Sequence, residues 1–226
     1  RFIEQPYPAL LEQDLGRTVV NLGCVNAGPD VFTRDEGLGP VLSGARGNVV
    51  QVMGAQNMNN RGYSVHPRRN DRFLSPSAML ESIYRGVDFT EFHFTRHMLG
   101  TLKEVSPERF ALVEDELKTA WVGRMRQLSE RLRGKSVLLW LSDRRPEDDN
   151  AAPMPGLGED PLFVDRAMID AVRPHFSEYV EVVASPRARA QGVEGMVFSP
   201  LDQPAAAQLP GPAVHDEAAE ALAPVV

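Results

Sequence analysis

The strongest constraint on the fold is a series of short apolar segments that alternate with helical patterns along the chain. The clearest is the run SVLLWLS at residues 136–142, which is apolar through its whole centre. A run of this kind is typical of a parallel strand that helices cover on both faces. We therefore predict four neighbouring parallel strands, at residues 19–23, 49–53, 137–141 and 179–183. The alternation predicts an α/β fold, a three-layer αβα sandwich around a mostly parallel sheet.

Helix signals separate these segments. The stretch YPALLEQDLG has Pro8 in its first turn and Gly16 as its stop. A long helix is predicted from the N-cap Ser106, which Pro107 follows, to Gly134, because apolar residues recur between them at helical spacing. Further helices are predicted near residues 77–84, 89–105, 162–172 and 215–222.

Length, charge and cysteine content narrow the class of protein. The 226 residues suit a single domain over residues 1–226, and the net charge of -7 argues against a nucleic-acid partner. No apolar run approaches the ~20 residues that cross a bilayer, so we expect no membrane span. Cys24 is the only cysteine, which excludes an internal disulfide and favours a reducing cytoplasm.

We expect no cofactor and no metal site. His93 and His97 are four residues apart in a predicted helix, so they share one face. They lack the glutamate of a zincin-like motif, and we interpret them as packing residues.

A stretch with many hydrogen-bonding side chains follows the strand predicted at residues 49–53. It reads GAQNMNNRGYSVHPRRNDRF and begins at Gly54. In open α/β sheets, ligands bind beyond the C-terminal ends of the strands, where this loop begins. Gln56 and Asn57 offer amide groups that donate hydrogen bonds, and His66 stands before a proline at the strand mouth. We predict that the loop forms one wall of a pocket for a small molecule or carbohydrate.

Four arginines crowd the same loop: Arg61, Arg68, Arg69 and Arg72. The planar guanidinium suits carboxylate, phosphate or sulfate, which predicts an anionic ligand facing at least one of them. The structural alternative is that these arginines pair with neighbouring carboxylates and hold the loop down. Gln56 and Asn57 have the same kind of alternative, since such amides often satisfy backbone groups in a tight loop.

The order of these pieces resembles the SGNH (GDSL-type) hydrolases. Three blocks carry the resemblance: YPALLEQDLGRTVVNLGCVNAG, VVQVMGAQN and PAVHDEAAEALAP. Gly23 or Gly28 stands for the glycine of the family's second block, next to Asn26, and Gly54 opens a Gly-Ala-Gln-Asn version of its third. His215 heads the last helix, as the histidine of the last block does. The stretches QVMGAQNM and HPRRNDRF are also similar to those of an uncharacterised bacterial domain family.

The resemblance implies an esterase or acyl-transfer enzyme that acts on an ester of a carbohydrate, a lipid or another small metabolite. His215 would be the base, and Gln56, beside Asn57, would stabilise the oxyanion. The resemblance also implies a flavodoxin-like sheet. The alternative is a non-catalytic or transferase-type domain of the same fold that binds an anionic or sugar ligand.

Two departures from the family pattern shape these expectations. The nucleophile-bearing first strand has no counterpart after Arg1, so we expect an N-terminally truncated fragment whose sheet lacks its first strand, between the second and third. Pro212 stands where an aspartate would precede the catalytic histidine, and Asp202 or Asp216 would have to replace it. The missing aspartate favours the binding alternative, whereas His215 and the Gly-Ala-Gln-Asn stretch favour the enzyme.

Overall fold

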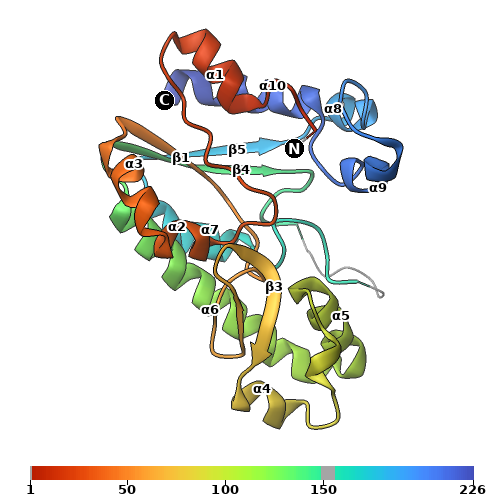
Figure 1. The fold of residues 1–226 in the computed structure, drawn as a ribbon. Coiled ribbons are helices and arrows are strands. Elements are labelled where there is room, and N and C mark those ends of the chain that lie inside the picture. The colour runs from red at the N-terminus through yellow and green to blue at the C-terminus, as the bar shows by residue number, and fades with distance from the viewer. Residues whose placement is uncertain (1, 149–155) are drawn as a thin grey trace.

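A parallel sheet lies at the centre of the upper part of the molecule (Figure 1). The computed structural model describes residues 2–148 and 156–226. Its sheet has the order β1 (Gly47–Gln51), β4 (Lys135–Ser142) and β5 (Glu178–Val183), with both pairings parallel. Three of the four predicted strands are therefore confirmed as parallel neighbours.

The central strand β4 sends successive side chains to opposite faces, as a strand must. One face meets α1 (Tyr7–Leu15), α8 (Pro186–Gln191) and α10 (Pro212–Leu222), which lie above the sheet in Figure 1. We call the apolar residues of this face the α1-side cluster; its buried members are Leu11, Val137, Leu139, Leu141, Val182, Ala184, Ala188, Val214, Ala218, Ala219 and Leu222. The predicted first helix is confirmed, and Gly16 ends it in a left-handed conformation with φ 60°.

The opposite face of the sheet packs against α6 (Pro107–Arg131) and α7 (Arg166–Val172). Ser106 caps α6 by accepting a hydrogen bond from the backbone N–H of Arg109, as its sequence predicts. Leu138 and Trp140 of β4 belong to the large apolar cluster on this face, which we call the α6-side cluster. The Nε1 of Trp121 donates to the Met53 carbonyl at 2.7 Å, which ties α6 to the chain just after β1.

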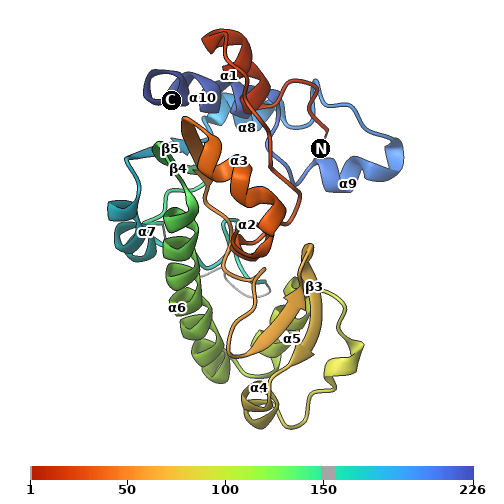
Figure 2. The same ribbon diagram turned by 60° about the vertical axis from the view of Figure 1, so that its left-hand side comes forward.

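The N-terminal half of α6 packs against a smaller lobe (Figure 2). It contains the antiparallel hairpin β2 (Tyr63–His66) and β3 (Arg69–Pro76), with α4 (Ala78–Ile83) and α5 (Thr95–Val105). The hairpin was not expected from the sequence, which predicted a loop as far as Pro76. The helix predicted at residues 89–105 is wrong in its first half: a 3-10 turn at Phe89–Glu91 precedes an extended Phe92–Phe94, and α5 begins only at Thr95.

Two short helices, α2 (Pro29–Arg34) and α3 (Gly39–Gly44), cross α6 near the start of the sheet. Asp30 of α2 is fully buried and accepts hydrogen bonds from the backbone and side chain of Asn59, at 2.9 and 2.7 Å. It also pairs with Arg124 of α6 at 2.7 Å, so one carboxylate joins α2, the loop after β1 and α6. The remaining short elements are α9 (Gln203–Ala206) and 3-10 turns at Glu36–Leu38, Arg173–His175, Pro200–Asp202 and Ala223–Val225.

The strand predicted at residues 19–23 is not part of the sheet. Residues 18–24 are neither helix nor strand, and no strand pairing or backbone ladder joins them to β1 among the described residues. Val20 is 62% exposed, whereas Val19 packs against the α1-side cluster and Leu22 against the α6-side cluster. The segment has the sequence pattern of a strand but no strand partner in the described part of the chain.

Within residues 2–148 and 156–226, no helix has the length and apolarity that a bilayer crossing requires.

Candidate functional site

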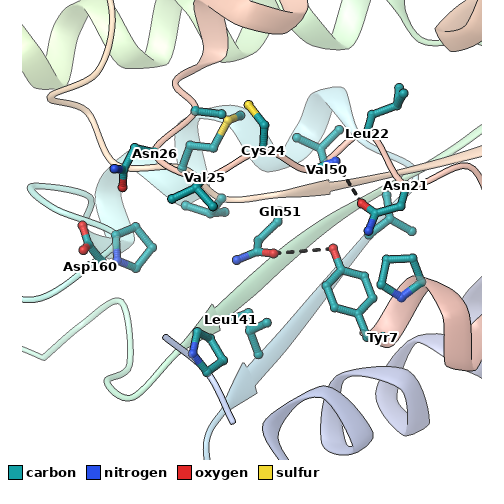
Figure 3. A pocket seen from close by; sticks show the side chains of 18 of the residues that line it. Tyr7, Asn21, Leu22, Cys24, Val25, Asn26, Val50, Gln51, Leu141 and Asp160 are labelled. Atoms are coloured by element: carbon teal, nitrogen blue, oxygen red, sulfur yellow. Dashed lines mark hydrogen bonds between the residues drawn. The ribbon is translucent and has the colours of Figure 1, made fainter. Parts of the chain in front are cut away.

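A large cavity lies along β1 and reaches the C-terminal ends of β1 and β4. Its volume is about 1890 Å³. One wall is the segment from Arg17 to Ala27, and the opposite wall is β1 with the loop that follows it to Asn57. In Figure 3, Gln51 lies between Asn26 and Asp160 on one side and Asn21 and Tyr7 on the other.

Gln56 lines this cavity near the C-terminal end of β1, and its amide oxygen has no hydrogen-bond partner in the described part of the chain. The residue is 7% exposed, and its Oε1 is buried without a hydrogen-bond partner in the described part of the chain. Gly54 leaves the room that this side chain uses, because a Cβ on Gly54 would collide with the Gln56 Oε1. A buried carbonyl without a partner costs about 1–3 kcal/mol, so the position of the Gln56 oxygen lowers the stability of the folded chain.

Asn57, the next residue, is fully engaged by the protein. Its Nδ2 donates to the Asn26 carbonyl at 3.0 Å, and its Oδ1 accepts from the Thr95 hydroxyl at 2.7 Å. Gly28 packs so closely on Asn57 that a Cβ there would collide with the Asn57 carbonyl oxygen. Asn57 therefore positions the turn at residues 24–28 beside β1, and both ends of its amide are held by the protein.

Asn26 holds the left-handed conformation with φ 58° at the tip of this turn, and it lines the cavity together with Gly23 and Gly54. These three residues, with Gln56 and Asn57, were predicted from the sequence, and the structure brings all five to one cavity.

The rim of the cavity carries charged and polar groups that the sequence did not single out. Arg96 pairs with Asp160 at 2.8 Å, and the Ser142 hydroxyl donates to the Asp160 carbonyl at 2.8 Å. Burial, with a smaller contribution from Asp71, raises the pKa of the Cys24 thiol. Cys24 is therefore a protonated thiol at neutral pH and a poor nucleophile.

His215 lies beside the cavity and not among the residues that line it. Its Nδ1 accepts a hydrogen bond from the Tyr7 backbone N–H at 3.2 Å, and its ring stacks on the Tyr7 ring with centroids 5.9 Å apart. Burial lowers the pKa of His215, so the imidazole is neutral at pH 7 with its proton on Nε2. A base of the triad type donates from Nδ1 to a carboxylate, and the bond to Tyr7 excludes that arrangement in this conformation.

Tyr7 separates His215 from Gln51, the last residue of β1. Its hydroxyl points to the Gln51 Oε1 at 3.5 Å, as Figure 3 shows, and burial raises its pKa to about 12. Tyr7 is thus a neutral phenol at the cavity wall. The sequence offers only a weak signal for Tyr7: the residue stands in the first turn of a helix close to the start of the chain.

The four predicted arginines lie outside the residues that line the cavity, a correction to the expected pocket wall. Arg61 binds Glu116 of α6 through its Nε at 2.7 Å, and the same carboxylate accepts the Arg61 backbone N–H. Arg69 faces Asp71 at 3.5 Å, and Arg72 lies over the Phe94 ring. The polar loop folds into the β2–β3 hairpin and turns away from the sheet edge, which explains the misplacement.

Arg68 and His66 lie at the turn of the same hairpin. The His66 Nδ1 accepts the backbone N–H of Arg68 at 3.3 Å, and neither residue lines the cavity. Among the described residues, no group of three or more His, Cys, Asp or Glu side chains is arranged to hold a metal ion.

Comparison with known proteins places the chain in one family. No curated protein and no solved structure matches the chain significantly. A family match covers residues 1–226, its whole length. The chain belongs to the family described as Domain of unknown function (DUF6473).

Proposed function

We propose that this chain binds a small hydroxylated molecule, of the class of a sugar or a sugar ester, at the C-terminal end of β1. The observation that carries the proposal is the Gln56 amide, which lines the cavity and has a buried oxygen without a partner. A hydroxyl both donates and accepts hydrogen bonds, so it can satisfy either end of that amide. An anion only accepts, and it would leave the Gln56 oxygen unpaired.

The charges at the rim support a neutral ligand over an anionic one. In the described part of the chain, the cavity lining carries four arginines, Arg17, Arg46, Arg96 and Arg189, and as many acidic side chains, Asp71, Asp143, Glu159 and Asp160, of which Asp160 pairs with Arg96. A free anion would have to compete with these carboxylates. We therefore rank the sugar form of the binding hypothesis above its anionic form.

The direct test is binding of simple sugars to the protein. Isothermal titration with a panel of neutral and N-acetylated monosaccharides should find a ligand, and inorganic phosphate and sulfate should not compete with it. Gln56→Ala should weaken binding about ten-fold, the value of one net hydrogen bond. Gln127→Ala is the matched control, because Gln127 is an exposed glutamine of α6 outside this cavity. Binding of phosphate or sulfate alone, or equal affinity in the Gln56→Ala protein, would contradict the proposal.

The second candidate is an SGNH-like ester hydrolase or acyltransferase, with the chain folded as a three-layer, flavodoxin-like domain. The cavity beside β1 favours it, since a nucleophile on an additional strand there would end next to Gln56. His215 would have to leave the Tyr7 N–H and change its tautomer before it could act as a base. A cytoplasmic location is proposed with it, from the single cysteine.

The enzyme reading is tested by hydrolysis of a short-chain aryl ester by a longer form of the protein. If that form is active, His215→Ala should lower kcat by roughly a thousand-fold or more, the scale of triad histidines. A stable longer form without esterase or acyl-transfer activity leaves the sugar-binding function alone.

A further inference from the structure

The edge strand β1 presents unpaired backbone groups to the cavity. The Val52 N–H donates to the Leu139 carbonyl at 2.8 Å, and the Lys135 N–H donates to the Arg46 carbonyl at 3.1 Å. Backbone groups of a strand alternate in direction from one residue to the next, so Arg46, Asn48, Val50 and Val52 face β4. The N–H and C=O groups of Val49 and Gln51 therefore face the other way, into the cavity.

The two central valines of β1 meet apolar layers on both faces of the sheet, whereas Gly47 and Gln51 at its ends are exposed. Val49 packs against the α1-side cluster and Val50 against the α6-side cluster, so apolar layers cover both faces. Natural edges are usually short, charged or covered by other structure. Here the edge faces a cavity that Leu11, Leu42 and Val214 help to line, residues of the two apolar clusters.

The segment at residues 18–24 forms the other wall and matches β1 in two respects. Val19 and Leu22 pack against the α1-side and α6-side clusters respectively, the same two faces that Val49 and Val50 use. The segment also runs in the same direction as β1, because Asn26 at its end contacts Asn57 beyond the C-terminal end of β1.

The space between these walls exceeds a small-molecule site. Pockets for drug-sized ligands have volumes of roughly 300–1,000 Å³, whereas this cavity measures about 1890 Å³. It runs beside the whole of β1, from Gly47 to Gln51.

We propose that a β-strand fills this cavity, parallel to β1, and pairs with Val49 and Gln51 on one side and with residues 18–24 on the other. A strand of about five to seven residues matches the length of its neighbours. This inference is independent of the ligand proposed above, and it assigns the cavity two parts: a slot for polypeptide along β1 and a ligand site at its C-terminal end.

The occupant that fits is the segment directly before Arg1 in a longer form of the chain. A parallel strand in the slot would end at the C-terminal edge of the sheet, where Phe2 lines the cavity and where the N label lies in Figure 1. From there the chain enters α1 within a few residues, and α1 covers the sheet and leads to residues 18–24. Strand, helix and parallel strand then form a single crossover unit with a connection of ordinary length.

Hydrogen exchange measured residue by residue on both forms of the protein tests the proposal. In the longer form, the amides of Val49 and Gln51 should exchange roughly 100-fold more slowly than in the 226-residue chain, because they become paired and buried. The amide of Val52, which already donates to β4, is the internal control and should be protected in both forms. Equal exchange of Val49 and Gln51 in the two forms would overturn the proposal.

A pair of proline variants supplies a second readout. Val49→Pro removes an N–H that faces the slot, so it should lower the Tm of the longer form far more than that of the 226-residue chain. Val52→Pro removes an N–H that pairs with β4 and should lower the Tm of both forms. If Val49→Pro affects both forms equally, the slot takes no strand. If the 226-residue chain instead dimerises and protects Val49 and Gln51, a second copy is the occupant and the assignment to the preceding segment is wrong.

Discussion

Two adjacent amides, Gln56 and Asn57, lie in one loop with opposite roles. Asn57 connects the turn at Asn26 to Thr95 through both ends of its side chain. The Gln56 oxygen is buried beside it without a partner. From the sequence, both residues fitted either a structural or a ligand-binding role, because residue type alone does not say which groups surround an amide. The structure separates the two roles.

This separation predicts opposite effects on stability. Asn57→Ala should lower the free energy of unfolding by about 1–3 kcal/mol, because it leaves the Asn26 carbonyl and the Thr95 hydroxyl without their partner. Gln56→Met keeps a similar shape and removes an unpaired buried oxygen, so stability should stay the same or rise. Urea denaturation of the two variants measures both effects. Loss of stability in Gln56→Met but not in Asn57→Ala would reverse the assignment.

His215 predicts a pH dependence of stability. Burial lowers the pKa of His215, and protonation of Nδ1 would remove the acceptor for the Tyr7 N–H. The unfolded chain, with a histidine pKa of about 6.5, takes up the proton first. The contribution of His215 is therefore complete above that pH and is lost as the pH falls towards the lower pKa of the folded state.

Urea denaturation between pH 5 and pH 8 checks this expectation. The loss of stability on acidification should be smaller in His215→Gln, whose amide oxygen can still accept the Tyr7 N–H. His93→Gln is the control, because His93 is exposed on the small lobe. An unchanged pH profile in His215→Gln would show that other groups cause the dependence.

At the scale of elements, strands with a continuous apolar run were predictable and strands with mixed patterns were not. β4 is apolar from Val137 to Leu141 and needs no knowledge of its neighbours to be recognised. The β2–β3 hairpin contains three arginines and has Pro67 at its turn, so its composition indicated a loop. Residues 18–24 have a strand sequence, but a strand needs a partner, and the described chain supplies none beside them. Only the structure could place the arginines, because their direction depends on that hairpin.

The packing of α2 on α6 depends on one buried carboxylate, which predicts a large effect of its loss. Asp30→Ala should lower the free energy of unfolding by about 2–4 kcal/mol, since Arg124 and Asn59 lose their common partner. Asp14→Ala, on the exposed side of α1, should change it by less than about 0.5 kcal/mol. Thermal or urea unfolding of the two variants gives the comparison. A small effect of Asp30→Ala would mean that α2 is held by its apolar contacts alone.

At the scale of the whole molecule, the two apolar clusters lie on opposite faces of one sheet and both reach the cavity beside β1. The folded 226-residue chain therefore exposes apolar surface that a strand in the slot would cover. The slope of unfolding free energy against urea concentration, the m-value, scales with the surface that unfolding exposes.

The longer form of the protein should have both a larger m-value and a higher urea midpoint than the 226-residue chain, because its folded state buries the cavity walls and pairs Val49 and Gln51. Matched urea titrations of the two forms, followed by tryptophan fluorescence of the buried Trp121 and Trp140, measure both quantities. Identical m-values and midpoints would mean that the cavity walls stay exposed in both forms, and that the slot is not a place for a strand.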